Sequence, residues 1–178
     1  MRLPLLTSLF VALVLAAGCG GEEESSSQTW VNDFCSAAAD WRTSLEDTVS
    51  QFQSPTDLSP DSVRGAVDDG LEATETFVDD VRALGRPETE AGQEAAAVVD
   101  SMTSDIQSTV DDLRSTFDSG GDSLPELVGK LSQASEQIDQ MGQELQSSLD
   151  ELEGLDGGQE LTDELESNED CTAARAGT

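Results

Sequence analysis

The chain has 178 residues, of which 38 are acidic and eight basic, and its net charge is −30. Such acidity argues against nucleic-acid binding, which depends on lysine and arginine, and favours a soluble monomer. The sequence has no histidine, so a Ser-His-Asp or Cys-His catalytic group cannot be built; we expect no enzymatic activity and no cofactor.

The first 19 residues are typical of a bacterial lipoprotein signal peptide. Arg2 precedes a short apolar stretch, and Leu15-Ala16-Ala17-Gly18-Cys19 has the pattern of a lipobox. The apolar stretch is shorter than the roughly 20 residues of a membrane-spanning helix. An ordinary cleaved secretory signal is the alternative, but a cysteine directly after Ala-Ala-Gly favours lipidation. We therefore expect cleavage of residues 1–18 and lipidation of Cys19, which anchors an exported protein on the extracytoplasmic face of the cell membrane.

Residues 19–28 are predicted to be an acidic, serine-rich tether, because they show no apolar periodicity. Cleavage of the signal leaves the net charge near −31, since Arg2 is the single charged residue removed. The domain behind the tether is predicted to span residues 29–171, a length that fits one domain. Residues 172–178 are predicted to be a frayed tail.

Four segments of this domain carry apolar residues at steps of three and four, which predicts four amphipathic helices. The second segment has clear boundaries: Ser59 and Pro60 are favourable at a helix start, and Gly85-Arg86-Pro87 is typical of a helix end. The fourth segment is predicted to start near Asp122 or Ser123 and to be terminated by Gly154 and Gly157-Gly158. The apolar stripes run from Trp30 to Phe52, from Val63 to Leu84, from Ala91 to Phe117 and from Leu124 to Leu152.

Short connections between consecutive helices predict an all-α fold, an up-down-up-down four-helix bundle. A short helical turn is expected at residues 161–165, before the last cysteine. A mostly disordered chain is the alternative, given the low hydrophobicity and high charge. Four regular stripes favour the folded bundle.

Cys35 and Cys171 form an even pair once Cys19 is lipidated, and an oxidising compartment favours a disulfide between them. An even number of antiparallel helices returns the chain to its starting end. The two cysteines would then lie at the same end of a four-helix bundle and would close it.

Four acidic side chains align beside the apolar stripe of the second helix, at steps of four, three and four. Like charges at this spacing cost a few tenths of a kcal/mol per pair. Binding of divalent cations or of a basic protein partner would offset that cost. A solvated face is the simpler interpretation in so acidic a protein. This weak candidate for a metal site consists of Asp68, Glu72, Glu75 and Asp79.

The lipobox at Cys19, the acidic tether, Phe34-Cys35 in an all-helical domain and a lone Cys171 near the end resemble the small cell-envelope lipoproteins common in Actinobacteria. The resemblance implies no activity. We expect a non-catalytic interaction or accessory module of the cell envelope. A binding protein or sensor for a small apolar ligand, a lipid or a divalent cation is the alternative, because bundle cores can hold ligands. The loops around residues 55–59 and 120–122 are predicted to point away from the membrane and to meet a partner.

Overall fold

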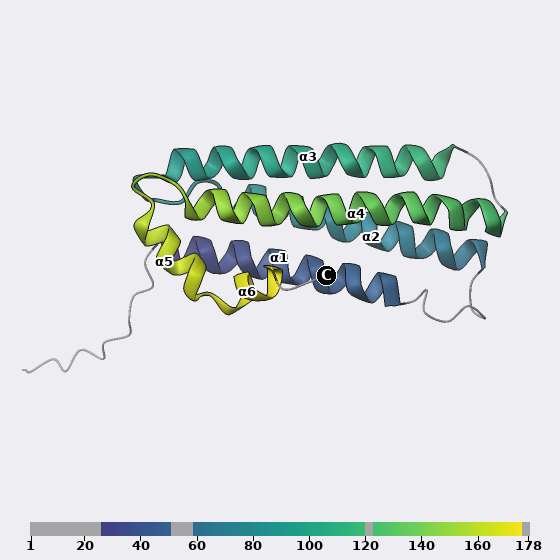
Figure 1. Cartoon of the computed structure of the whole chain (residues 1–178), viewed down its shortest axis with the longest axis horizontal. Coiled ribbons are helices and arrows are strands. Elements are labelled where there is room, and N and C mark those ends of the chain that lie inside the picture. The colour runs from purple at the N-terminus through teal and green to yellow at the C-terminus, as the bar shows by residue number, and fades with distance from the viewer. Residues whose placement is uncertain (1–25, 51–58, 120–122, 176–178) are drawn as a thin grey trace, which may run out of the picture.

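The computed structural model describes residues 26–50, 59–119 and 123–175, and these ranges are helical apart from short connections (Figure 1). The predicted all-α class is confirmed for them. No helix in these ranges has the length and apolar character that crossing a membrane requires. The helices are α1 (Ser26–Ser50), α2 (Pro60–Ala83), α3 (Gly92–Asp118), α4 (Leu124–Glu153), α5 (Gln159–Ser167) and α6 (Glu169–Arg175).

The boundaries of α2 follow from local chemistry and confirm the prediction. The hydroxyl of Ser59 accepts a hydrogen bond from the backbone N–H of Ser62 at 3.1 Å, and Pro60 is the first helical residue. Gly85 follows the helix with a φ of 64°, a left-handed conformation that suits glycine because it has no Cβ. The predicted limits of α4 are confirmed as well, with Ser123 and Gly154 as its caps.

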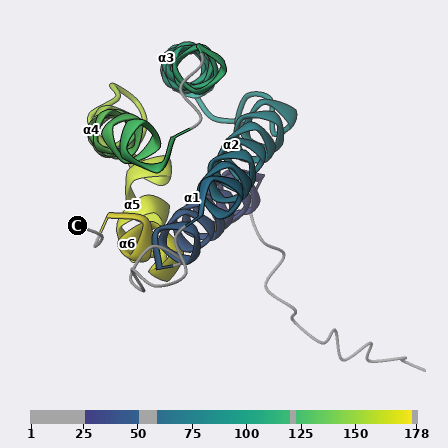
Figure 2. The ribbon, with the colours of Figure 1, turned by 90° about the vertical axis from the view of Figure 1, so that its right-hand side faces the viewer.

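Each long helix packs against the next one along the chain, and α5 and α6 pack against α1. Figure 2 shows α5 and α6 between α1 and α4, which make few direct contacts with each other. Apolar side chains from all these helices form one core. Its largest fully buried members are Phe34, Phe77, Met102, Ile106, Leu127, Leu145, Leu149, Leu152, Leu161 and Leu165.

Two tryptophans of α1 contact α2 and the residues just after it in this core, one through an aromatic stack and the other through a hydrogen bond. Trp30 stacks on Phe34 with 5.4 Å between ring centroids, and Trp41 of α1 stacks on Phe77 of α2 at 4.8 Å. The indole N–H of Trp30 donates to the carbonyl of Gly85 at 3.0 Å, so the start of α1 lies beside the end of α2. Both tryptophans are buried, as their shared position on the apolar stripe predicted.

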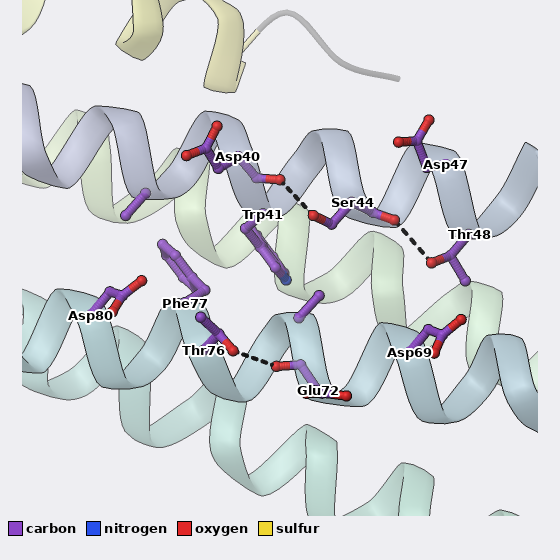
Figure 3. Close-up of a pocket in the computed structure, with 12 residues that line it drawn as sticks. Asp40, Trp41, Ser44, Asp47, Thr48, Asp69, Glu72, Thr76, Phe77 and Asp80 are labelled. Carbon is purple, nitrogen blue, oxygen red and sulfur yellow. Dashed lines mark hydrogen bonds between the residues drawn. The ribbon is translucent and has the colours of Figure 1, made fainter.

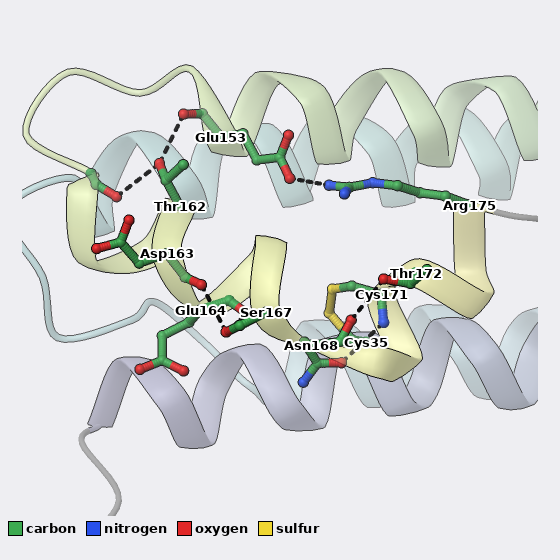
Figure 4. Close-up of polar contacts among 11 residues, drawn as sticks. Cys35, Glu153, Thr162, Asp163, Glu164, Ser167, Asn168, Cys171, Thr172 and Arg175 are labelled. Atoms are coloured by element: carbon green, nitrogen blue, oxygen red, sulfur yellow. Dashed lines mark hydrogen bonds and ion pairs between the residues drawn. A yellow bond between two sulfur atoms is a disulfide. The ribbon is translucent and has the colours of Figure 1, made fainter.

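The disulfide between Cys35 of α1 and Cys171 of α6 joins α6 to α1, with 4.7 Å between the two Cα atoms (Figure 4). Both cysteines are fully buried. Asn168 reinforces this attachment, because it accepts a hydrogen bond from the Cys171 N–H at 3.0 Å and donates one to the side chain of Asn32 at 2.7 Å. The predicted bridge is thereby confirmed.

The C-terminal segment is more ordered than the sequence predicted. The expected turn at 161–165 is the middle of α5, and residues 172–175, predicted as a frayed tail, form the last turn of α6. Ala174 is fully buried, and its carbonyl accepts a hydrogen bond from Arg42 of α1 at 2.7 Å. Arg175 forms an ion pair with Glu153 of α4. Local periodicity carries no sign of these long-range contacts.

The predicted tether also needs correction where it meets the domain. Ser26–Gln28 belong to α1, and the buried hydroxyl of Ser27 donates a hydrogen bond to Glu160 of α5. Several predictions fall outside the described residues: the signal peptide, Cys19 with the rest of the tether, Phe52, most of the 55–59 loop, the 120–122 loop and residues 176–178.

Candidate binding groove

An apolar groove lies between α1 and α4 beyond the C-terminal end of α6. α5 and α6 fill the seam between these two helices near Ser26, whereas the groove occupies the part nearer Ser50. Its volume is about 500 Å³, and its lining is predominantly apolar. The lining includes Leu45, Leu71, Leu113, Phe117, Leu131 and Ile138.

Small residues make this groove deep. Ala66 and Gly70 of α2 and Ala134 of α4 line it. The two alanines are almost completely buried, and their side chains are too short to fill the space between α1 and α4. The groove therefore follows from residue size on α2 and α4, together with the short reach of α6.

Two exposed valines stand on the rims of the groove. Val49 of α1 is 51% exposed and Val128 of α4 is 45% exposed, and in the described ranges they are the exposed large apolar side chains. Both line the groove. Single exposed apolar residues are common on protein surfaces, but a recessed apolar surface with exposed apolar rims is typical of a binding site.

Acidic side chains flank the groove. Asp139 of α4 lines it and is exposed. Glu46 of α1 is exposed and follows the groove-lining residue Leu45 directly in the sequence. Arg42 is engaged with the Ala174 carbonyl of α6, so it does not reach along the groove. Lys130 of α4 lies near Phe117, with its ammonium 6.0 Å from the ring centroid and donating a hydrogen bond to the Phe117 carbonyl at 3.4 Å. The lining is apolar apart from a few hydroxyl groups and Asp139, its charged member.

A second hollow, between α1 and α2, is acidic rather than apolar (Figure 3). Trp41 and Phe77 form its base, but both are nearly fully buried and offer little ring surface to a ligand. The hydroxyl of Ser44 donates to its own helix backbone at 3.0 Å, as do those of Thr48 and Thr76 at 2.9 Å. These contacts leave a solvated charged surface, whose acidic members are Asp40, Asp47, Asp69, Glu72 and Asp80.

No family model, no curated protein and no solved structure matches this chain. Its functional interpretation therefore depends on its own residues.

The predicted acidic stripe of α2 is divided between different surroundings. Glu72 lines the hollow between α1 and α2, whereas Glu75 forms an ion pair with Arg114 of α3. The hydrogen bond with the Glu75 carboxylate, together with its charge, raises the pKa of Arg114 above its ordinary value. Asp79 and Glu75 line a small hollow between α2 and α3, and Asp68 is exposed. Within the described ranges, no three or more Cys, Asp or Glu side chains are grouped so that they could hold a metal ion.

Sequence reasoning missed the groove, although one signal pointed to it. Val128 lies outside the predicted apolar stripe of its helix, one position after Leu127, which is buried on the core side. An apolar residue beside a stripe widens the apolar face of a helix beyond what a single seam covers. The additional apolar residue Val128 was visible in the sequence. The apolar residues of α1 that lie across the groove from it were not, because they are far away along the chain.

Proposed function

We propose that this protein is a lipid-anchored, extracytoplasmic interaction module that presents the apolar groove to a partner and has no catalytic role. The observation that carries this proposal is the recessed apolar surface between α1 and α4, with Val49 and Val128 exposed on its rims. The lipobox at Cys19 supports the anchor, and the acidic surface suits a protein that is held by its lipid rather than adsorbed to anionic membrane.

We further infer an up-down-up-down four-helix bundle, to which α5 and α6 add a partial fifth layer. The pairing of the start of α1 with the end of α2 supports this topology, as do the short connections between helices. Leu45 follows Ser26 by nineteen residues, so the groove begins about 29 Å along α1 at 1.5 Å per residue. In this arrangement the groove is in the half of the bundle farther from the anchor, where a partner has access.

A second candidate function is the binding of a small apolar ligand. The volume of the groove, about 500 Å³, lies in the range of ligand pockets and favours this alternative. Asp139 in the groove lining and the net charge of −30 disfavour a ligand with an anionic head group. A divalent-cation sensor has no comparable support, because the acidic stripe of α2 is divided between different surroundings.

Cys19→Ser is expected to move nearly all of the protein from the membrane fraction to the soluble fraction. The substitution removes the sulfur that would carry the acyl chains, and the net charge of −30 disfavours adsorption of the domain to anionic lipid. Cell fractionation followed by immunoblotting measures the distribution. Ser25→Ala is the matched control, because it changes another residue of the predicted tether and leaves both the anchor and the disulfide intact. A Cys19→Ser protein that stays with the membrane contradicts the anchor.

A photo-crosslinking residue at Ser132, which is exposed and lines the groove, is expected to give a protein adduct in intact cells of the native host. The same residue at Asp105, on an exposed position of α3, is the control and is expected to give none. The adduct should be lost when Val49 and Val128 are both replaced by Gln. A lipid-sized adduct would favour the second candidate, and no adduct at all would contradict the interaction module.

A further inference from the structure

We propose that the groove binds the apolar face of an amphipathic helix of a partner protein, and that this helix carries lysine or arginine on its flanks. The inference rests on the proposed function, an interaction module, and assigns the chemical class of its partner.

The protein's own C-terminal helices show what fits between α1 and α4. Leu161 and Leu165 of α5 are spaced four residues apart, and Cys171 and Ala174 of α6 three apart. All four are fully buried, and α5 and α6 pack against α1, with α5 also against α4. This seam therefore accepts a helical face with apolar residues at i and i+3 or i+4. The groove continues the same seam beyond Arg175.

The length of the groove sets the length of the helix. Along α4 it extends from Val128 to Met141, which is about 20 Å at 1.5 Å per residue. A partner helix of about 13 residues has the same length and offers apolar side chains at i, i+4, i+7 and i+11. The exposed Val49 and Val128 then contact its two sides, and their apolar surface is removed from water.

The charge around the groove selects the flanks of the helix. Asp139 is exposed in the groove lining, Glu46 is exposed next to the lining residue Leu45, and the whole chain carries a net charge of −30. Such a field attracts lysine and arginine and repels phosphate and carboxylate groups, so it favours a basic helix over an anionic phospholipid. The polar edge formed by Ser132 and Ser135 matches the polar rim of protein interfaces.

A designed peptide tests this inference with the mature chain carrying Cys19→Ser. The peptide has 15 residues, leucine at four positions spaced i, i+4, i+7 and i+11, and lysine on both flanks; a second peptide has glutamate in place of lysine. We expect the lysine peptide to bind at least about tenfold more tightly at low salt, and the difference to shrink at high salt. Fluorescence anisotropy with labelled peptides gives both affinities.

Groove variants locate the binding. Replacing Val49 and Val128 together by Gln is expected to lower the affinity for the lysine peptide about tenfold or more, because the apolar contacts of these two side chains with the peptide are lost. Both side chains are exposed, so the substitutions leave the core unchanged. Asp139→Asn should lower the affinity for the lysine peptide about two- to threefold, and should leave the affinity for the glutamate peptide unchanged or slightly higher. Asp69→Asn, in the acidic hollow on the other side of α1, is the matched control and should change neither affinity.

Equal affinity for the two peptides, or an affinity that the valine variant leaves unchanged, would overturn the inference. Native mass spectrometry supplies two further contrary outcomes. A phospholipid that stays bound to the native chain but not to the valine variant would assign the groove to a lipid. A dimer that the native chain forms and the valine variant does not would assign it to a second copy of the chain. The proposed function would survive the failure of the peptide if the Ser132 crosslink still joined a protein, so the two failures are distinguishable.

Discussion

Reduction of the Cys35–Cys171 disulfide is expected to lower the melting temperature of the protein by about 10–20 °C. The bridge joins residues 136 positions apart, and closure of so long a loop reduces the entropy of the unfolded chain by an equivalent of about 5 kcal/mol. For a domain of this size, each kcal/mol changes the melting temperature by about 2–4 °C. Circular dichroism during heating, with and without reductant, measures the shift.

The control for this result is the double variant Cys35→Ala/Cys171→Ala. It should melt near the reduced protein and should not respond to reductant. Alanine is used because serine would bury a hydroxyl at two fully buried positions. A reductant effect of similar size in the double variant, or none in the native chain, would show that the disulfide does not limit unfolding.

Replacing Trp41 by Ala is expected to lower the free energy of unfolding by about 3–5 kcal/mol, the range for truncation of large buried aromatic residues. Trp41 is 3% exposed, stacks on Phe77 of α2, and donates its indole N–H to the hydroxyl of Thr74 at 3.0 Å. The substitution removes these contacts and leaves a cavity between α1 and α2. Urea denaturation followed by circular dichroism gives the free energy without relying on tryptophan fluorescence.

Trp41→Phe separates the contributions of ring and hydrogen bond. Phenylalanine keeps an aromatic ring for the stack, and Thr74 keeps its own hydrogen bond to the Gly70 carbonyl at 2.8 Å. We expect a loss of about 1–2 kcal/mol, which combines one hydrogen bond with a small volume deficit. If the phenylalanine variant were as unstable as the alanine variant, the aromatic stack could not be the main stabilising contact.

Local features of this fold were predictable because their chemistry is local. Ser59 and Gly85 mark the limits of α2 through capping and a left-handed backbone, and both effects depend on residues next to them. The disulfide was predictable from the even number of remaining cysteines. The helical structure of α6 was not predictable, because Arg42 and Glu153, which contact it, lie on helices far away in the sequence.

The candidate site was predictable to a smaller extent for the same reason. A groove needs two surfaces, and the sequence showed only that Val128 was an additional apolar residue on one of them. Val49 belongs to a regular stripe, so its exposure depends on where α6 ends, which periodicity does not encode. The acidic stripe was a real alignment along α2, but the partner of Glu75 is Arg114 on α3, and only the packing of the two helices brings them together.

The position of the disulfide also determines what a cut in the backbone would do to the protein. The segment between Cys35 and Cys171 contains α2–α5 and the connections between them, and the bridge closes it into a covalent ring. A protease that cuts this ring once would produce two polypeptides that remain one molecule. Because the fragments share the core and cannot diffuse apart, a nicked protein would retain its fold and its connection to residues before Cys35. The bridge thus adds tolerance of backbone cleavage to its effect on stability.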